Sequence, residues 1–300
     1  MNRIKHTIVL GILWLVALIP LRIGRALGTL IGRVNYWIDS RSTKVTRVNL
    51  ALCFPEVQQD RLERLVQRSL AHTGQMLVET PGVWLRRSAA ERAIVAVEGE
   101  GLLTAALADE RGVIILLPHL GNWEMFNVFI RRYGRMTALY QPPHQTYLQS
   151  LMAEVRERAG NELVPTDIRG LRTLYKRLGA GGTVTVLPDQ VPETGRFVSF
   201  FGIPALTDGL ISRLANRSNA RVLSVVVWRC TGGYRVCVRE PVADVGSDDP
   251  DLALAAVNQT IEAYVREEPE QYQWEYKRFR ERPSGEEKLY SFRTTETLYH

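Results

Sequence analysis

Cysteine is scarce in this 300-residue chain, which contains only Cys53, Cys230 and Cys237. The number is odd and no two cysteines have C-x-x-C spacing, so neither a disulfide framework nor a zinc site is predicted, and a reducing compartment fits best. The chain also lacks a G-x-S-x-G nucleophile elbow, internal repeats and low-complexity tracts. These absences argue against a disulfide-stabilised secreted protein and leave one large domain, with or without a short appendage.

An excess of positive charge narrows the choice of partners. The chain has 38 Lys and Arg against 32 Asp and Glu, a formal net charge of +6. Such a balance indicates contact with a phospholipid surface, a phosphorylated lipid, an acidic carrier protein or a nucleic acid. No nucleic-acid motif or alternation of aromatic and basic residues accompanies the charge, so no nucleic acid is expected as a partner.

An uncharged, strongly apolar run covers residues 7–21, between Arg3 and Lys5 on one side and Arg22 and Arg25 on the other. As a helix it spans about 22 Å, short of a hydrocarbon core of about 30 Å. A cleaved signal peptide, a spanning anchor that extends to about residue 30, and a helix lying in the membrane interface are three alternatives. We expect residues 1–30 to form a membrane anchor or interfacial helix, and residues 31–300 to form the main domain, which the cysteine usage places in the cytoplasm.

Short apolar runs alternate with amphipathic segments along the rest of the chain. Helices are predicted at 58–80 (stopped by Pro81 and Gly82), 122–133, 147–159, 171–178, 208–219 and 252–266. Strands are predicted at 113–118, 136–140, 183–187, 222–230 and 234–239, the last two joined as a hairpin across Gly232-Gly233. This alternation predicts an α/β fold with a mixed central β-sheet flanked by helices, together with the N-terminal apolar membrane-attachment helix. Sites in such sheets form at the carboxyl ends of strands, where His119 and Asp189 fall.

The segment with the clearest chemistry is His119-Leu-Gly-Asn-Trp-Glu124. The histidine follows a predicted strand, Gly121 permits a sharp bend, and Glu124 falls in the first turn of the next helix. We expect the Glu124 carboxylate to hold the imidazole in one tautomer, so that His119 acts as a general base on a hydroxyl group. No metal is proposed, because the pair lacks further ligands.

Five blocks of sequence resemble one known family. His119 to Glu124 resembles the signature H-[FL]-G-N-W-E of the bacterial lipid A acyltransferases, the late (secondary) enzymes of lipid A biosynthesis, which belong to the His-x4-Asp/Glu glycerolipid acyltransferases. The other blocks are Arg47-Val-Asn-Leu50 with Phe54-Pro55, Val186-Leu-Pro-Asp-Gln190, Phe200 to Gly209, and Gln271 to Trp274 with Arg278 to Pro283. In place of a histidine that relatives often have near the end, this chain has Tyr276, which leaves the role of that position open.

The resemblance implies an O-acyltransferase with a glycerolipid-acyltransferase-like fold. It would pass a fatty acyl group from acyl carrier protein to a hydroxyl of a lipid A precursor, at the cytoplasmic face of the bacterial inner membrane. His119 and Glu124 would be the catalytic residues, the carrier-protein thioester the co-substrate, and no cofactor would be needed. Transfer to another glycolipid, an aminolipid or a lysophospholipid is an alternative, and a non-catalytic lipid-binding protein is a second.

Four further residues are candidates for substrate binding. Asp189 and Gln190 end a strand beside His119 and either position the acceptor or close the loop. Arg169 begins the helix before that strand and is a candidate for binding a lipid phosphate or the carrier's phosphopantetheine phosphate. Asn122 is a candidate too, although a helix cap is the simpler interpretation.

Two further segments have open interpretations. Residues 200–209 either shape an acyl pocket or cap a helix that begins near Thr207 or Asp208. The basic cluster Lys277, Arg278, Arg280 and Arg282 either meets anionic head groups or the acidic carrier, or is a solvated face.

Overall fold

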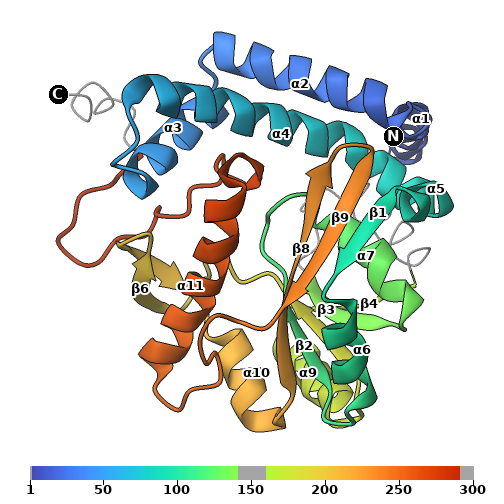
Figure 1. The fold of residues 1–300 in the computed structure, drawn as a ribbon, viewed down its shortest axis with the longest axis vertical. Helices are drawn as coiled ribbons and strands as arrows, with labels where there is room; N and C mark the ends of the chain where they lie inside the picture. The colour runs from blue at the N-terminus through green and yellow to red at the C-terminus, as the bar shows by residue number, and fades with distance from the viewer. Residues whose placement is uncertain (1, 141–159, 291–300) are drawn as a thin grey trace.

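The computed structural model describes residues 2–140 and 160–290, and its elements follow the predicted α/β order (Figure 1). The helices are α1 (Asn2–Ala17), α2 (Leu21–Trp37), α3 (Arg41–Cys53), α4 (Gln59–Leu85), α5 (Arg87–Arg92), α6 (Glu100–Ala108), α7 (Glu124–Phe129), α9 (Ile168–Gly179), α10 (Leu210–Ser218) and α11 (Pro250–Glu267), with 3-10 turns η1 (Ile130–Arg132) and η2 (Pro269–Gln271). The strands are β1 (Ile94–Glu98), β2 (Val113–Leu116), β3 (Met136–Tyr140), β4 (Glu162–Pro165), β5 (Thr183–Val186), β6 (Arg196–Phe200), β7 (Ile203–Thr207), β8 (Arg221–Cys230) and β9 (Gly233–Arg239). The helix predicted at 147–159 lies outside the described residues.

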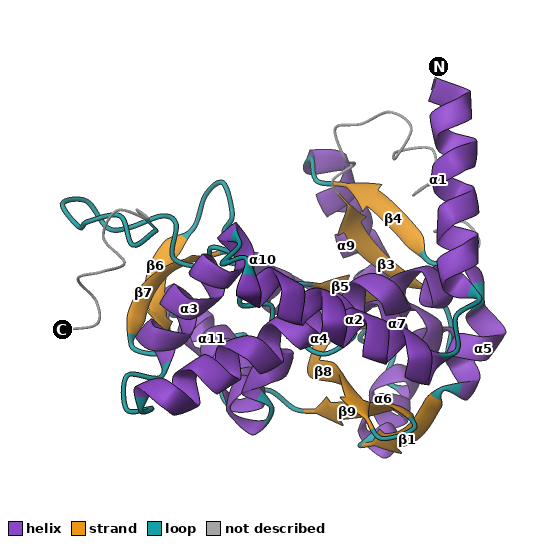
Figure 2. Ribbon diagram, turned by 90° about the horizontal axis from the view of Figure 1, so that it is seen from above, coloured by secondary structure: helices purple, strands orange, loops and turns teal. Residues whose placement is uncertain are grey.

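Seven of these strands form one mixed sheet in the order β1-β9-β8-β2-β5-β3-β4. From β8 to β4 all neighbours are parallel, and the antiparallel β8–β9 hairpin reverses the direction of the last two strands. The predicted mixed sheet and its hairpin are therefore confirmed. β6 and β7 form a separate antiparallel pair at the end of the molecule away from β1 (Figure 2).

Helices cover both faces of this sheet, which explains why its central strand β2 is apolar at every position. In β2, Ile114 and Leu116 face a core shared with α3, α9, α10 and α11, while Val113 and Ile115 face a core shared with α6 and α7. All four residues are fully buried. The unbroken apolar run that predicted this strand thus comes from two-sided burial.

Helix α2 packs along α4 through three buried glycines, Gly24, Gly28 and Gly32. A Cβ atom on Gly28 would lie 2.5 Å from the Cα of Gln75, and one on Gly32 would lie 2.2 Å from the carbonyl oxygen of Leu70. The two helices therefore approach at backbone-to-backbone distance and run side by side across the sheet (Figure 1). The predicted boundary between residues 30 and 31 falls inside α2.

The N-terminal apolar segment forms two helices where one was predicted. Across residues 2–140 and 160–290, no single helix is long and apolar enough to cross a membrane. His6–Ala17 and Leu21–Trp37 pass that test only together, as a pair bent by 114°. The predicted single attachment helix is therefore not confirmed, and Figure 2 shows α1 projecting from the body at one end.

Other differences from the prediction concern the ends of two helices and several elements that were missed. Helix α4 continues through Pro81 to Leu85, although a stop was predicted there. Proline removes one backbone donor, and packing of α4 against α1 and α2 offsets that loss. The helix predicted at 122–133 is shorter and ends in a 3-10 turn, and β1, β4, β6, β7 and α6 were not predicted.

Candidate active site

The register of the sheet brings His119 and Asp189 together. Strands β2 and β5 are parallel neighbours, with Leu116 paired to Val186. His119 and Asp189 each follow that pair by three residues, so both leave the same edge of the sheet at the same height. The prediction that both lie at the carboxyl ends of strands is confirmed, and the structure adds that these strands are neighbours.

The turn that carries His119 into α7 depends on Gly121. Its φ is +61°, and a Cβ atom there would lie 2.0 Å from the carbonyl oxygen of Val227 on β8. Gly121 N donates to the Gln271 carbonyl at 2.9 Å, and Asn122 N donates to the Val227 carbonyl at 2.8 Å. Glycine is therefore required both for the backbone conformation and for the close approach to β8.

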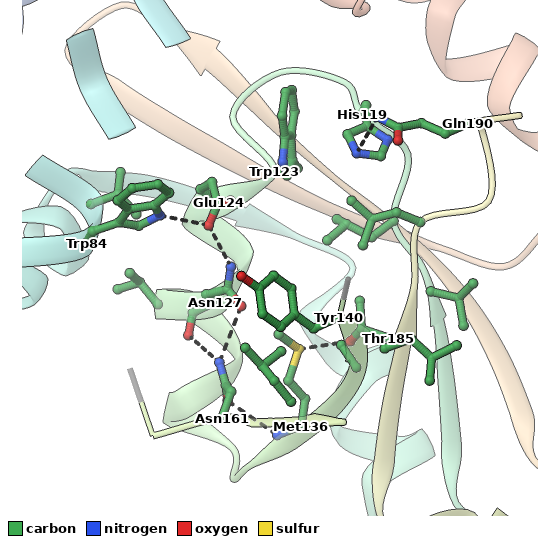
Figure 3. Close-up of a pocket in the computed structure, with 18 of the residues that line it drawn as sticks. Trp84, His119, Trp123, Glu124, Asn127, Met136, Tyr140, Asn161, Thr185 and Gln190 are labelled. Carbon is green, nitrogen blue, oxygen red and sulfur yellow. Dashed lines mark hydrogen bonds between the residues drawn. The ribbon is translucent and has the colours of Figure 1, made fainter. Parts of the chain in front are cut away.

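The imidazole of His119 is held by three neighbours. Its Nδ1 lies 2.7 Å from Oδ1 of Asp189, whose Oδ2 accepts from the His119 backbone N–H at 2.8 Å. Its Nε2 lies 3.3 Å from Nε2 of Gln190, and the Trp123 ring meets it edge-on with centroids 4.9 Å apart (Figure 3). With an ionised Asp189, the ring proton lies on Nδ1, which leaves Nε2 as the acceptor, the arrangement that a general base needs.

The Asp189 carboxyl group is almost completely enclosed, with 2% of the residue exposed. Burial alone raises its pKa, but the charge of His119 and the hydrogen bonds from the His119 ring and backbone outweigh that effect and hold the pKa below its usual value. Asp189 is therefore an anion that favours an imidazolium at position 119. Of the two interpretations of Asp189, the structure supports a contact that closes the loop and orients the histidine.

Glu124 does not hold the ring as predicted, because both ring nitrogens of His119 already have partners. Its Oε2 instead accepts from Trp84 Nε1 at 3.0 Å and from Asn127 Nδ2 at 3.1 Å (Figure 3). The reason is the turn itself, which starts α7 at Glu124 and directs this side chain toward α4. Its predicted catalytic role stays a prediction.

His119 and Glu124 both line a cavity of about 640 Å³. The cavity extends from the edge of the sheet between α7, β3 and β5, and its lining is mostly apolar. Apart from the site residues, these lining residues include Val128, Met136, Ala138, Leu139, Leu163 and Leu187. A cavity of this volume with a mostly apolar lining suits a flexible apolar ligand whose reactive end reaches His119.

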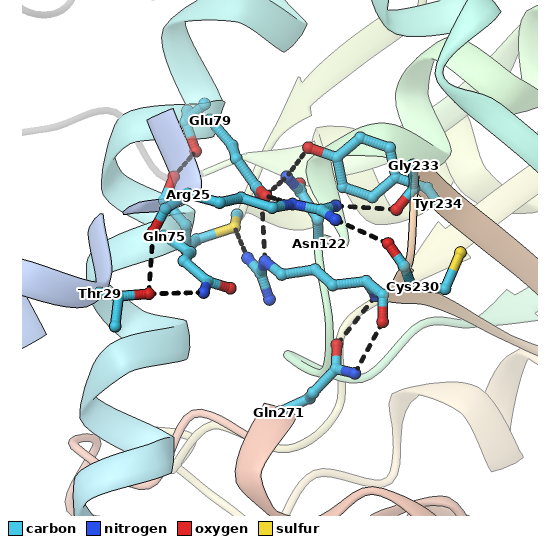
Figure 4. A network of polar contacts seen from close by, with 12 residues as sticks. Arg25, Thr29, Gln75, Glu79, Asn122, Cys230, Gly233, Tyr234 and Gln271 are labelled. Carbon is cyan, nitrogen blue, oxygen red and sulfur yellow. Dashed lines mark hydrogen bonds and ion pairs between the residues drawn. The ribbon is translucent and has the colours of Figure 1, made fainter. Parts of the chain in front are cut away.

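Asn122 lies beneath the site. It is fully buried, and its Nδ2 donates to Oε2 of Glu79 at 2.9 Å (Figure 4). Glu79 also pairs with Arg229 and Arg25 at 2.8 Å each. Burial alone raises the pKa of Glu79, but the two arginines and these hydrogen bonds hold it below its usual value. The Asn122 side chain therefore does not cap α7 but ties the loop of the site to α4 and β8, and substrate binding by it stays a prediction.

Arg169 lies in the first turn of α9, and its side chain is exposed. The cap of this helix is Asp167, whose carboxylate accepts from the backbone N–H groups of Arg169 and Gly170. A Cβ atom on Gly170 would lie 1.8 Å from the carbonyl oxygen of Pro165, which explains the glycine as a close contact between α9 and β4. Arg169 is not among the cavity residues, and phosphate binding by it stays a prediction.

The C-terminal segment supports the loops of His119 and Asp189. Gln273 N donates to the His119 carbonyl at 3.1 Å, and the Tyr276 hydroxyl accepts from Val191 N at 2.9 Å. The Asn49 side chain donates to the carbonyls of Trp274 and Tyr276 at 2.7 and 2.8 Å. The unusual Tyr276 therefore has a structural role, which is to hold the chain two residues after Asp189.

The basic cluster and the segment 200–209, whose interpretations were open, are both resolved in part by the structure. Arg278 is buried, donates to the Leu206 carbonyl at 2.6 Å and to Thr207 Oγ1 at 2.9 Å, and lies over the Phe200 ring. The basic cluster is therefore not simply a solvated or lipid-binding face. Helix α10 begins at Leu210 without a side-chain cap, so the cap predicted near Thr207 is wrong.

Sequence reasoning also missed Trp84 and Asn127, the partners of Glu124, because neither stands in a recognisable motif.

A histidine backed by a buried carboxylate, at the edge of a mostly apolar cavity, is a site for proton transfer to or from an apolar ligand. Comparison with known proteins identifies the class. Residues 2–281 match the family model described as bacterial lipid A biosynthesis acyltransferase. The chain belongs to this family.

Three relatives come from Escherichia coli strain K12. The lipid A biosynthesis palmitoleoyltransferase is 31% identical over 94% of this chain and 92% of its own length. The lauroyltransferase is 27% identical over 92% and 91%, and the myristoyltransferase is 25% identical over 90% and 85%. The predicted family and the predicted enzyme class, an acyltransferase of lipid A biosynthesis, are confirmed.

Proposed function

We propose that this enzyme transfers a fatty acyl group from an acyl carrier protein thioester to a hydroxyl of a lipid A precursor, with His119 as general base. The observation that carries the proposal is the contact of 2.7 Å between His119 Nδ1 and Asp189, because it leaves Nε2 as the acceptor at the cavity. The acyl chain of the thioester occupies the apolar cavity, and its carbonyl group lies at the edge beside Nε2.

The reaction needs one proton acceptor and no covalent enzyme intermediate. His119 Nε2 takes the proton of the acceptor hydroxyl as the oxygen attacks the thioester carbonyl. The tetrahedral intermediate collapses as the C–S bond breaks, and the imidazolium returns the proton to the departing thiolate. Asp189 holds the ring and balances its positive charge, while the exposed Gln190 amide is a donor for the developing oxyanion.

Glu124 contributes a carboxylate to the same cavity. It is bonded to Trp84 and Asn127 on the α4 side of Trp123, and it keeps further lone pairs that can accept hydrogen bonds. We assign it to binding the polar part of the acceptor so that the reacting hydroxyl faces His119. Its removal then weakens acceptor binding and alignment, whereas removal of His119 abolishes the chemical step.

The membrane surface of this protein is proposed to be the outer side of α1 and α2, at the cytoplasmic face of the inner membrane. The glycine face of α2 packs on α4, which leaves its remaining apolar side chains outside. The exposed apolar residues of the two helices include Ile8, Ile12, Leu15, Leu18, Ile23, Leu27, Leu30, Ile31, Val34 and Trp37. An apolar surface with the exposed arginines Arg22 and Arg33 suits an interface rich in anionic lipids.

The direct test uses detergent-solubilised wild type and His119→Ala, with acyl carrier protein thioesters of several chain lengths and an under-acylated lipid A precursor. Mass spectrometry should find a mass gain of one acyl chain with the wild type and none with the variant. Transfer by a folded His119→Ala variant would contradict the role of the base. Wild-type transfer only to another lipid would keep the chemistry and replace the acceptor.

A further inference from the structure

A second cavity, of about 400 Å³, lies beside the first, between α1, α4 and the segment 271–275. Trp84, Trp123 and Glu124 line both cavities, whereas His119 lines only the larger one. The two cavities are therefore neighbours that share the Glu124 carboxylate and two indole rings as their common wall. The proposed reaction assigns a ligand to the larger cavity and none to the smaller one.

The smaller cavity suits a hydrocarbon. Leu13, Met76, Leu77 and Pro81 contribute apolar surface to it, beside the two tryptophans. Burial and the positive charge of Arg229 lower the pKa of His72 in its wall to about 4, so this imidazole is neutral near pH 7. Arg229 itself is paired with the buried Glu79 at 2.8 Å. Its polar walls therefore include a neutral histidine and an arginine that is held by a carboxylate, beside the apolar residues named above.

The cavity is continuous with the apolar outer side of the N-terminal helices. Its wall includes Leu13, while Ile12 and Leu15 on the same helix are 54% and 69% exposed. Leu77, on α4, also lines the cavity and is 65% exposed, so this residue marks its rim. A chain that leaves the proposed membrane surface along α1 therefore reaches the cavity without crossing the polar edge of the sheet.

We propose that the smaller cavity binds a fatty acyl chain that the acceptor lipid already carries, while the larger cavity binds the chain being transferred. This inference rests on the proposed function. A chain in the smaller cavity brings the polar part of its lipid to Glu124, with His119 on the other side of Trp123. The two cavities on either side of Glu124 then hold the acceptor hydroxyl next to the donor thioester. Holding the two groups in this orientation favours their reaction.

Filling the smaller cavity tests the assignment. Leu13→Trp and Thr80→Trp add bulk from α1 and α4, and Gln67→Trp is a matched control because Gln67 lies on α4, is exposed and lines neither cavity. We expect the first two variants to raise the KM for the acylated acceptor by about tenfold or more. The KM for the donor thioester and its chain-length preference should be unchanged, and the control should match the wild type.

Folding of each variant is checked by circular dichroism, and cross-linking provides an independent measurement on the wild type. An acceptor with a photoreactive group at the end of its acyl chain should label Met76 or Leu77, and a donor labelled in the same way should label Met136 or Leu139. An altered donor preference, unchanged kinetics in both filled variants, or acceptor label at Met136 would overturn the inference. Failure of the proposed function is distinct, since the wild type would then transfer no acyl group to any lipid A precursor.

Discussion

Replacing Asp189 with asparagine removes the charge behind His119 while keeping its size. The carboxylate receives two hydrogen bonds from His119, at 2.7 and 2.8 Å, in a place where 2% of the residue is exposed. An amide that turns its NH2 group toward Nδ1 moves the ring proton to Nε2, and Nε2 is then no longer a base. We therefore expect kcat to fall by about 10³- to 10⁴-fold, the size of effect seen when a buried aspartate behind a catalytic histidine becomes asparagine.

The pH dependence separates this role from a structural one. Because Asp189→Asn lacks the negative charge of the carboxylate, the acid limb of its rate profile should differ from that of the wild type. Glu124→Gln should leave that limb in place and raise the KM of the acceptor. Asp208→Asn is a matched control, because Asp208 lines the same cavity but pairs with Arg213 at 3.2 Å.

The assay is the initial rate of acyl transfer between pH 5 and 9, with denaturation curves recorded for each variant. Asp189→Asn is expected to fold, since asparagine keeps the shape of the side chain and can still accept from the His119 backbone N–H. If a folded Asp189→Asn enzyme kept a rate within about tenfold of the wild type, the tautomer argument would be wrong. The same loss in Glu124→Gln, with the same shift in pH, would return the orienting role to Glu124.

Three further predictions concern stability and membrane contact. The pKa of His72 is lowered to about 4 in the folded chain, so below about pH 6.5 the unfolded chain takes up a proton that the folded chain does not. The free energy of unfolding should therefore fall by about 2 kcal/mol from pH 7 to 5 through this group. Urea denaturation of His72→Gln should lack this part of the pH dependence. Gly28→Ala places a Cβ atom 2.5 Å from the backbone of α4 and should cost about 3 kcal/mol, whereas Gly11→Ala, with nothing within 4 Å, should not lower the melting temperature. Leu27→Glu with Leu30→Glu should remove binding to anionic vesicles in flotation while leaving the fold intact, and vesicle binding equal to wild type would contradict the proposed surface.

The sequence predicted the central strands well because two-sided burial leaves a strong local signal. Val113 to Leu116 and Thr183 to Val186 lie within their predicted ranges, and β3 has the predicted bounds. The edge strands β1 and β4 were missed, and both are partly exposed. The stop predicted at Pro81 failed because a local rule about proline does not include the packing of α4 against other helices.

The part of the site that lies at the carboxyl ends of strands could be predicted from the sequence. Placing His119 and Asp189 at the ends of strands required only the apolar runs, whereas the pairing of β2 with β5, which brings the two side chains into contact, came from the structure. The prediction that Glu124 is the partner of the His119 imidazole was wrong, because a separation of five residues says little about where a turn directs its side chains. Trp84 and Asn122 have roles set by long-range contacts, and no local pattern encodes such contacts.

The two carboxylates differ in how they are anchored, and this difference argues for different roles. Asp189 is rigid and enclosed, held by two hydrogen bonds from the residue it serves, which suits a group that must keep one ring orientation through every step. Glu124 is partly exposed, lies in the wall between two cavities, and accepts from Trp84 and Asn127 through Oε2. A carboxylate with accepting capacity left over, between two apolar subsites, is suited to receive the hydroxyl groups of an incoming lipid. In the proposed reaction, the segment from His119 to Glu124 therefore sets the distance between the general base and the carboxylate that binds the acceptor. The charge that orients His119 comes from Asp189, which follows the neighbouring strand β5.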